Sequence, residues 1–174
     1  MVPTGTSELR AGFATDVQSS SADPSMYFAP LVSRYKDRKR SANILLVGPH
    51  VNMDTESKSK ARPPTEGGLI VAQDVFENVL DFTFSRLGIS TESNIQHPVV
   101  MSEPMCNPGY CRGLTSELLF EAYGAPSVTY GLDSLFAAYA NGVQNDGLVI
   151  GSGHSSTTIV PMVGGRGILS NAKR

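Results

Sequence analysis

Residues 97–104 read HPVVMSEP, and residues 105–108 continue with MCNP. The apolar run beside the first proline is typical of a strand, so the pattern predicts a strand over 97–101 that begins at a proline. Residues 103–108 contain two prolines and predict a loop. We therefore expect a short buried strand that ends in a polar, proline-bounded loop.

Further strands are expected on both sides of this stretch. Short aliphatic runs at 44–47 and 69–72 have the length and composition of buried strands. Two more apolar segments, 147–150 and 157–162, flank a Gly-Ser-Gly-His turn. These segments predict that strands occur in both the first and the last third of the chain.

Helical periodicity appears between the predicted strands. From Asp74, apolar residues recur at helical spacing as far as Gly88, which is a natural stop. Asp74 itself suits either the first turn or the N-cap. Apolar spacing predicts further helices over 114–123, ended by Gly124, and over 132–140, ended by Asn141-Gly142. Strands that lead into helices and return to strands predict an α/β fold.

Three polar segments interrupt this pattern. Residues 17–24 lack periodicity and predict a loop, and residues 54–66 contain two prolines and predict a mobile insertion. Residues 34–40 hold five basic residues and one acid. Three interpretations of 34–40 stay open: a solvated basic loop, a contact for DNA phosphates or an acidic partner, or part of a nuclear address.

Composition limits the classes of protein to which the chain can belong. Hydrophobic residues make up 40% of the 174 residues and charged residues 17%, which is typical of a folded domain and not of a disordered chain. The net charge of -2 excludes a surface that binds nucleic acid through a general basic surplus. No apolar run spans a bilayer, no secretory signal is evident, and two cysteines form no disulfide framework. We expect an intracellular globular chain without a membrane partner.

Several motifs, in order along the chain, resemble the actin family. They are RAGFA at 10–14, HPVVMSEP at 97–104 with Asn107-Pro108 and Arg112, ELLFE at 117–121, LFAAY at 135–139 and GSG at 151–153. This resemblance implies an actin-like (ribonuclease H-like) α/β ATPase fold. It implies a first lobe over 1–146, with polar insertions near 17–24 and 54–66, and the opening hairpin of a second lobe over 147–174. In the family a C-terminal segment returns to pack on the first lobe, and without it we expect the helices at 114–123 and 132–140 to be partly bare. Such a chain is either an incomplete product, which we favour, or one that needs a partner to remain soluble.

Three segments are most similar to the actin-related subunit of nuclear chromatin remodellers of the INO-eighty type. They are FAPLVSRYKDR at 28–38, SELLFEAYG at 116–124 and YGLDSLF at 130–136. This finer resemblance implies a location in the nucleus. It also implies that the partners are other subunits of such a complex, together with nucleosomal DNA.

The family's two phosphate hairpins are altered in this chain. The first normally reads DNGSG, and the same register here gives PTGTS at 3–7; the second normally reads DSGDG, and here it is GSGHS at 151–155. The glutamine that positions the attacking water aligns with Asp133, and the histidine aligns with Thr158. Loss of the acids removes the charges that order Mg²⁺, so we expect no hydrolysis, no catalytic residue and no metal site.

Nucleotide binding is a separate question from hydrolysis. Backbone N–H groups and hydroxyls of the hairpins still provide candidates for phosphate contact, together with the basic residue that the family places near the phosphates. The candidate cofactor-binding residues are Gly5, Thr6, Ser7, Arg10, Ser152 and Gly153. ATP is the one cofactor considered, and only half of its site lies in this chain.

The resemblance predicts a non-catalytic scaffold subunit that supports nucleosome remodelling, transcription regulation and DNA repair. The candidate contacts for DNA or a partner are Arg34, Lys36, Arg38, Lys39 and Arg40. Two alternatives stay open. One is an actin-fold nucleotide-binding protein or ATPase, and the other is a filament-forming cytoskeletal relative of actin.

Overall fold

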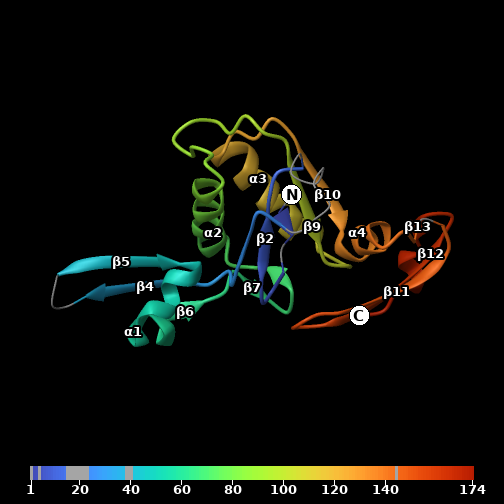
Figure 1. The fold of residues 1–174 in the computed structure, drawn as a ribbon, viewed down its shortest axis with the longest axis horizontal. Helices are drawn as coiled ribbons and strands as arrows, with labels where there is room; N and C mark the ends of the chain where they lie inside the picture. The colour runs from blue at the N-terminus through green and yellow to red at the C-terminus, as the bar shows by residue number, and fades with distance from the viewer. Residues whose placement is uncertain (1, 4, 15–23, 38–40, 144) are drawn as a thin grey trace.

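A computed structural model describes residues 2–3, 5–14, 24–37, 41–143 and 145–174, without the side chains of 2–3 (Figure 1). The loop expected over 17–24 lies outside the described residues except for its last position. Three of the candidate contact residues, Arg38, Lys39 and Arg40, also lie outside them. In the part of the chain that the structure describes, no helix is long and apolar enough to cross a membrane.

A small parallel sheet forms the centre of the molecule. Its strand order is β1 (Val2–Pro3), β9 (Val99–Glu103) and β10 (Val128–Leu132), with Val2 opposite Met101. The chain leaves β1 through a turn into β2 (Leu9–Ala11), which pairs with β3 (Met26–Phe28) in an antiparallel hairpin. This arrangement places the first turn of the chain beside the end of the central strand.

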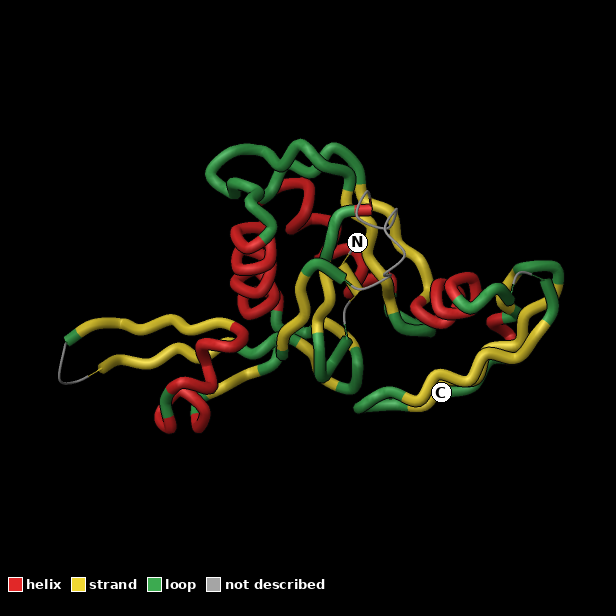
Figure 2. Tube along the Cα trace, in the orientation of Figure 1, coloured by secondary structure: helices red, strands yellow, loops and turns green. Residues whose placement is uncertain are grey.

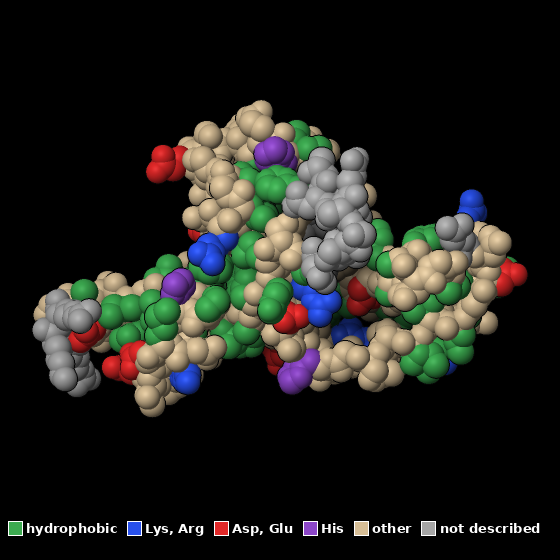
Figure 3. Space-filling model, viewed as in Figure 1, with side chains coloured by type: hydrophobic (Ala, Val, Ile, Leu, Met, Phe, Trp, Pro, Cys, Tyr) green, Lys and Arg blue, Asp and Glu red, His purple; other side chains and the backbone are tan. Residues whose placement is uncertain are grey.

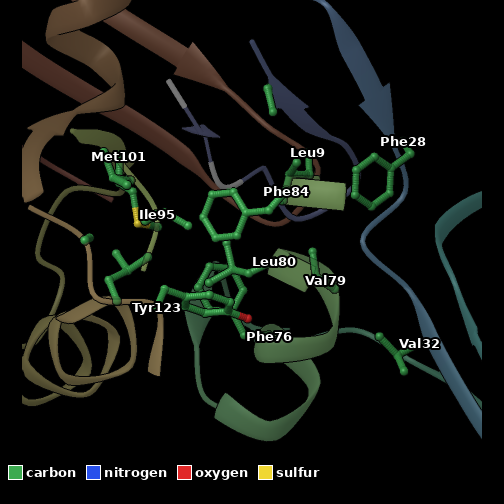
Figure 4. Packing of buried hydrophobic residues seen from close by; sticks show 14 residues of the cluster. Leu9, Phe28, Val32, Phe76, Val79, Leu80, Phe84, Ile95, Met101 and Tyr123 are labelled. Carbon is green, nitrogen blue, oxygen red and sulfur yellow. The ribbon is translucent and has the colours of Figure 1, made fainter. Parts of the chain in front are cut away.

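Helix α2 (Gln73–Arg86) covers this sheet with its apolar face. Phe76, Leu80 and Phe84 of α2 are each at most 3% exposed and pack in the same cluster as Met101 of β9 (Figure 4). The ring of Tyr123 meets the ring of Phe84 edge to face, with centroids 5.1 Å apart. Burial of aromatic and aliphatic groups from helix and sheet stabilises this core.

An antiparallel sheet projects from the core as an arm, at the left of Figure 1. Its strand order is β5 (Ala42–Val47), β4 (Val32–Asp37) and β6 (Ala61–Arg62). A 3₁₀ segment (Gly48–Met53) and helix α1 (Thr55–Ser59) connect β5 to β6. The two-residue strands β7 (Thr65–Glu66) and β8 (Leu69–Ile70) form the next hairpin, whose tip is Gly67-Gly68 with positive φ at both residues.

The second half of the chain follows the order strand, helix, strand, helix and hairpin (Figure 2). After β9 come α3 (Gly109–Glu117) and a π-helical turn (Leu118–Ala122), and after β10 comes α4 (Asp133–Ala140). The chain then forms the antiparallel sheet of β11 (Gly147–Ser152), β12 (Thr157–Val163) and β13 (Arg166–Gly167), followed by a 3₁₀ turn (Leu169–Asn171). The α/β arrangement predicted from the sequence is confirmed.

Several expected boundaries are wrong. The strand expected from His97 begins at Val99, and the strand expected over 69–72 ends at Ile70. The helix expected from Leu114 begins at Gly109, because the turn after Pro108 is already helical. Strand β10 was not expected, since Gly131 interrupts its apolar pattern.

Two segments expected as loops contain regular structure. Residues Arg34 to Asp37 belong to β4, where strand alternation places the exposed Arg34 and Lys36 on one face and the half-buried Tyr35 and Asp37 on the other. The segment 54–66 contains α1, capped by the Asp54 carboxylate, which accepts a hydrogen bond from the Glu56 N–H at 3.3 Å. It also contains β6 and β7. A polar composition concealed these short elements because none of them has a fully apolar face.

One face of the β11–β12 hairpin is apolar and bare. Ile150 is directly opposite Ile159, and Leu148 is opposite Pro161. Leu148 and Ile150 are 60% and 63% exposed, and hydrophobic side chains gather over this hairpin at the right of Figure 3. Phe120 and Tyr139, from the two segments expected to be partly bare, are also exposed.

Candidate functional site

The first candidate hairpin is the turn between β1 and β2. A Cβ on Gly5 would lie 2.1 Å from the carbonyl oxygen of Glu8, so the turn requires glycine at this position. Arg10 does not point a free guanidinium into the turn: its Nε donates to the Glu8 carboxylate at 2.9 Å. This ion pair is exposed and weak, but it engages the basic side chain expected near the phosphates.

The second candidate hairpin is the turn between β11 and β12. The Gly153 N–H donates to the Ser156 carbonyl at 2.9 Å and closes the turn. The Ser152 and Thr157 hydroxyls are 3.4 Å apart across the last strand pair. His154 is exposed at the tip. The turn therefore carries hydroxyl groups and one imidazole, and its residues 151–155 include no carboxylate.

The two hairpins lie near opposite ends of the sequence, but they contact each other in the folded chain. Thr6 Oγ1 and Ser155 Oγ lie 3.2 Å apart, within hydrogen-bonding distance. The tip of the β7–β8 hairpin lies at the same place, because a Cβ on Gly68 would be 3.5 Å from Ser155 Oγ. The guanidinium of Arg174 donates a hydrogen bond to the Gly67 carbonyl beside them. The structure thus brings the sequence-predicted residue Thr6 against the second hairpin.

Asp133 and Thr158 do not join this group through a hydrogen bond. The Asp133 carboxylate accepts from the Ser134 N–H at 2.6 Å and from the Ser134 hydroxyl at 3.0 Å, at the first turn of α4. Thr158 is buried in β12, where its hydroxyl lies 3.5 Å from the Gly151 carbonyl. An acid in the first turn also favours the helix dipole, so a structural role accounts for Asp133.

The end of β9 carries an ion pair in which the carboxylate is buried and the guanidinium is half exposed. Glu103 is 7% exposed, and its carboxylate accepts from Arg112 Nε at 2.9 Å and from the Asn107 side-chain amide at 3.0 Å. A second guanidinium nitrogen of Arg112 also donates to Glu103, which makes the pair bidentate and raises the pKa of Arg112. The motif residues 103, 107 and 112 thus join β9 to α3, and they line a small pocket with Gly68 of the β7–β8 hairpin.

The basic segment is described only in part. Arg34 and Lys36 lie on the same face of β4, and both are exposed. Near them, the Tyr35 hydroxyl donates to the Asp54 carboxylate at 2.9 Å, which lowers the pKa of Asp54 and raises that of Tyr35. The sequence reasoning missed two further cations, Lys60 and Arg62, which line a cavity with Arg34. Lys60 and Arg62 are two residues apart in a basic stretch, and this spacing was the one feature of the sequence that could have indicated them.

No metal site is evident in the residues that the structure describes, since no three His, Cys, Asp or Glu side chains cluster there. Cys106 and Cys111 form no disulfide. The geometry therefore offers hydroxyls, backbone N–H groups and glycine turns at the meeting point of the hairpins. The nearest carboxylate along the first turn, Glu8, is paired with Arg10.

Comparisons with known proteins agree with the resemblance seen in the sequence. The family model described as "Actin" matches residues 1–174. The chain is 42% identical over 175 residues to "Actin-like protein arp5" of Schizosaccharomyces pombe. The aligned region covers 100% of the chain and 23% of that protein. It is 36% identical over 173 residues to "Actin-related protein 5" of Homo sapiens, covering 98% of the chain and 28% of that protein.

A similar match is found in "Actin-related protein 5" of Saccharomyces cerevisiae. That protein is 36% identical over 172 residues, which are 98% of the chain and 22% of the yeast protein. The chain therefore spans between a fifth and a third of the length of these relatives. The expected α/β actin-like fold is confirmed by the family match.

Proposed function

Because the chain belongs to the actin family, we propose that it is part of a non-catalytic actin-related subunit of a nuclear chromatin-remodelling complex of the INO-eighty type. Similarity over nearly the whole chain to proteins named actin-related protein 5 supports this assignment. The proposal includes a location in the nucleus, and a supporting role in nucleosome remodelling, transcription regulation and DNA repair.

One observation carries the non-catalytic part of the proposal: the hydroxyls of Thr6 and Ser155 contact each other. In an actin-fold ATPase, the same two turns hold a phosphate and Mg²⁺ between them. Here the turns at 3–7 and 151–155 contain no carboxylate to order a metal ion. The contact also joins the two proposed parts of the fold directly, which supports a scaffold role.

The proposed scaffold has two parts. Residues 1–146 form the first lobe, and residues 147–174 form the opening hairpin of a second lobe. Loops and the β4–β5 arm carry the recognition surfaces, because a rigid scaffold places variable contacts on its projecting segments. The cations Arg34 and Lys36, continued along the sequence by Arg38, Lys39 and Arg40, are the proposed contact for DNA or a partner subunit.

Purification through a tag at the native locus, followed by mass spectrometry, tests the assignment. We expect subunits of a chromatin remodeller to be recovered together with the tagged protein. A matched purification of the variant Arg34→Gln/Lys36→Gln tests whether these cations contribute. Recovery of the tagged protein without any chromatin-associated factor would overturn the proposed function.

The two alternative functions, a filament-forming relative of actin and an ATPase, predict different outcomes in two assays. A filament-forming relative of actin would sediment with its polymer in a pelleting assay, and an ATPase would release phosphate from ATP. The proposed scaffold does neither. Sedimentation that depends on ATP and Mg²⁺ would favour the cytoskeletal alternative.

A further inference from the structure

A cavity of about 510 Å³ lies between the β5–β4–β6 sheet and helix α2. The sheet side carries three basic side chains, Arg34, Lys60 and Arg62, and the helix side carries Asp74 and Asn78. This cavity is separate from the Glu103–Arg112 pair and from the meeting point of the two hairpins. Of its lining residues, the function proposed above uses only Arg34.

Backbone geometry explains why these side chains converge. Val32 and Arg34 are two residues apart in β4 and therefore share one face of the sheet. Arg62 of β6 is directly opposite Val32 in the antiparallel register, so it lies on that same face. On α2, Asp74 and Asn78 are four residues apart and line one side of the helix. The sheet thus faces the helix with two guanidinium groups against an acid and an amide.

The charges in the cavity are only partly compensated. Lys60 bonds to the Glu56 carboxylate at 2.8 Å and lies 5.1 Å from the centre of the Tyr35 ring. Neither Arg34 nor Arg62 forms an ion pair with another of the described residues. Two guanidinium groups beside a cavity of this size provide four or more N–H donors for an incoming anion.

We propose that the cavity between β4, β6 and α2 binds an extended acidic segment of a partner polypeptide. Carboxylates of such a segment match the forked donors of Arg34 and Arg62. The helix wall requires hydrogen-bond donors on the ligand, because the Asp74 carboxylate accepts hydrogen bonds and repels anions. A peptide backbone supplies N–H donors to that wall, whereas a DNA backbone supplies acceptors alone.

This inference rests on the proposed scaffold function, since it names the chemistry of one partner. Its failure is distinguishable from failure of that function. Loss of peptide binding without loss of co-purifying remodeller subunits would remove the acidic-peptide site and leave the scaffold role in place. Absence of remodeller subunits would remove the scaffold role whatever the peptide result.

Fluorescence anisotropy on the full-length protein tests the site. The probe is a short labelled peptide of alternating glutamate and glycine, and the matched probe replaces glutamate by glutamine. We expect the glutamate peptide to bind and the glutamine peptide not to bind. The variant Arg34→Gln/Arg62→Gln is expected to weaken binding roughly tenfold or more, because each lost charge-assisted bond contributes substantially.

The control variant is Lys58→Gln/Arg166→Gln, which removes two exposed charges that do not line the cavity. We expect its affinity for the glutamate peptide to be within about twofold of that of the unchanged protein, because salt screens the attraction between the peptide and distant exposed charges. If Arg34→Gln/Arg62→Gln does not fold, Arg34→Lys and Arg62→Lys retain the charge, lose the fork, and are expected to bind more weakly than the unchanged protein.

Three results would overturn the proposal. One is no measurable binding of the glutamate peptide. Another is an equal loss in the cavity variant and in the control variant, which indicates general electrostatic attraction. The third is displacement of the peptide by a short DNA duplex whose binding depends on Arg34 and Arg62 to the same extent. That result would show that the cavity binds phosphates.

Discussion

The hydroxyls of Thr6 and Ser155 lie 3.2 Å apart, although the two residues are separated by 149 positions. One belongs to the turn that follows β1, and the other belongs to the turn between β11 and β12. This contact joins the beginning and the end of the described chain. It lies between the two glycine-containing turns at 3–7 and 151–155.

A double-mutant cycle on Thr6→Ala and Ser155→Ala measures this contact. Because the hydroxyl pair is exposed, we expect a coupling energy of about 0.5–1 kcal/mol in denaturant unfolding. The cycle Thr6→Ala with Ser170→Ala is the control and should be additive, because the Ser170 hydroxyl contacts Asn171 and not Thr6. Additivity in the first cycle would contradict the contact.

The turn between β1 and β2 should not tolerate a side chain at Gly5. A Cβ there would meet the Glu8 carbonyl oxygen at 2.1 Å, so Gly5→Ala forces the backbone to move. We expect a loss of about 1–3 kcal/mol in the free energy of unfolding. Gly113→Ala in α3 meets no atom within 4 Å and should stabilise by about 0.5–1 kcal/mol. Equal effects of the two substitutions would refute the geometry of the turn.

The bidentate pair at the end of β9 should contribute to stability. Arg112→Gln leaves the buried Glu103 carboxylate with Asn107 as its remaining side-chain partner. We expect a loss of about 2 kcal/mol in the free energy of unfolding, and a smaller loss for Arg112→Lys, which keeps the charge without the fork. The exposed Arg166→Gln serves as control and should change stability by less than about 0.5 kcal/mol.

Stability should fall in alkaline solution partly because of Tyr123. Its buried hydroxyl lies 2.9 Å from the Asp81 carboxylate and 3.0 Å from the Glu77 carbonyl, and the two oxygens share its single O–H donor. Burial, and then the Asp81 hydrogen bond, raise the pKa of Tyr123 in the folded state. The folded state therefore holds this proton more tightly, and its contribution is complete below the unfolded pKa of about 10 and is lost as pH rises above it.

Unfolding free energies between neutral and alkaline pH test this account. Tyr123→Phe should reduce stability at neutral pH by about 1 kcal/mol and should flatten the alkaline decline. Tyr110→Phe, which alters an exposed tyrosine, is the control. An unchanged alkaline slope in Tyr123→Phe would show that other groups cause the decline.

The sequence predicted the central elements well and the polar ones poorly. The helix after Asp74 and the hairpin around Gly153 were evident because their apolar residues follow the period of a helix or strand. Helix α1 has five residues and strand β6 has two, and both were missed because segments this short show no such period. Tertiary contacts with β4 give these short elements their structure.

For the candidate site, local sequence identified the turns but not their meeting. Glycine and hydroxyl residues at 3–7 and 151–155 were recognisable from the family resemblance. That Ser155 lies against Thr6 depends on the path of the whole chain, which no local pattern contains. The cavity lined by Arg34 and Arg62 was hidden for the same reason, since its walls come from β4, β6 and α2.

The central claim is that the joined hairpins do not hydrolyse nucleotide, and steady-state phosphate release from ATP and Mg²⁺ tests it most directly. We expect the full-length protein to release phosphate at the rate of a heat-denatured sample. Thr6→Ala/Ser155→Ala should give the same result, because separating the hydroxyls restores no carboxylate. Magnesium-dependent release clearly above the denatured control would contradict the account.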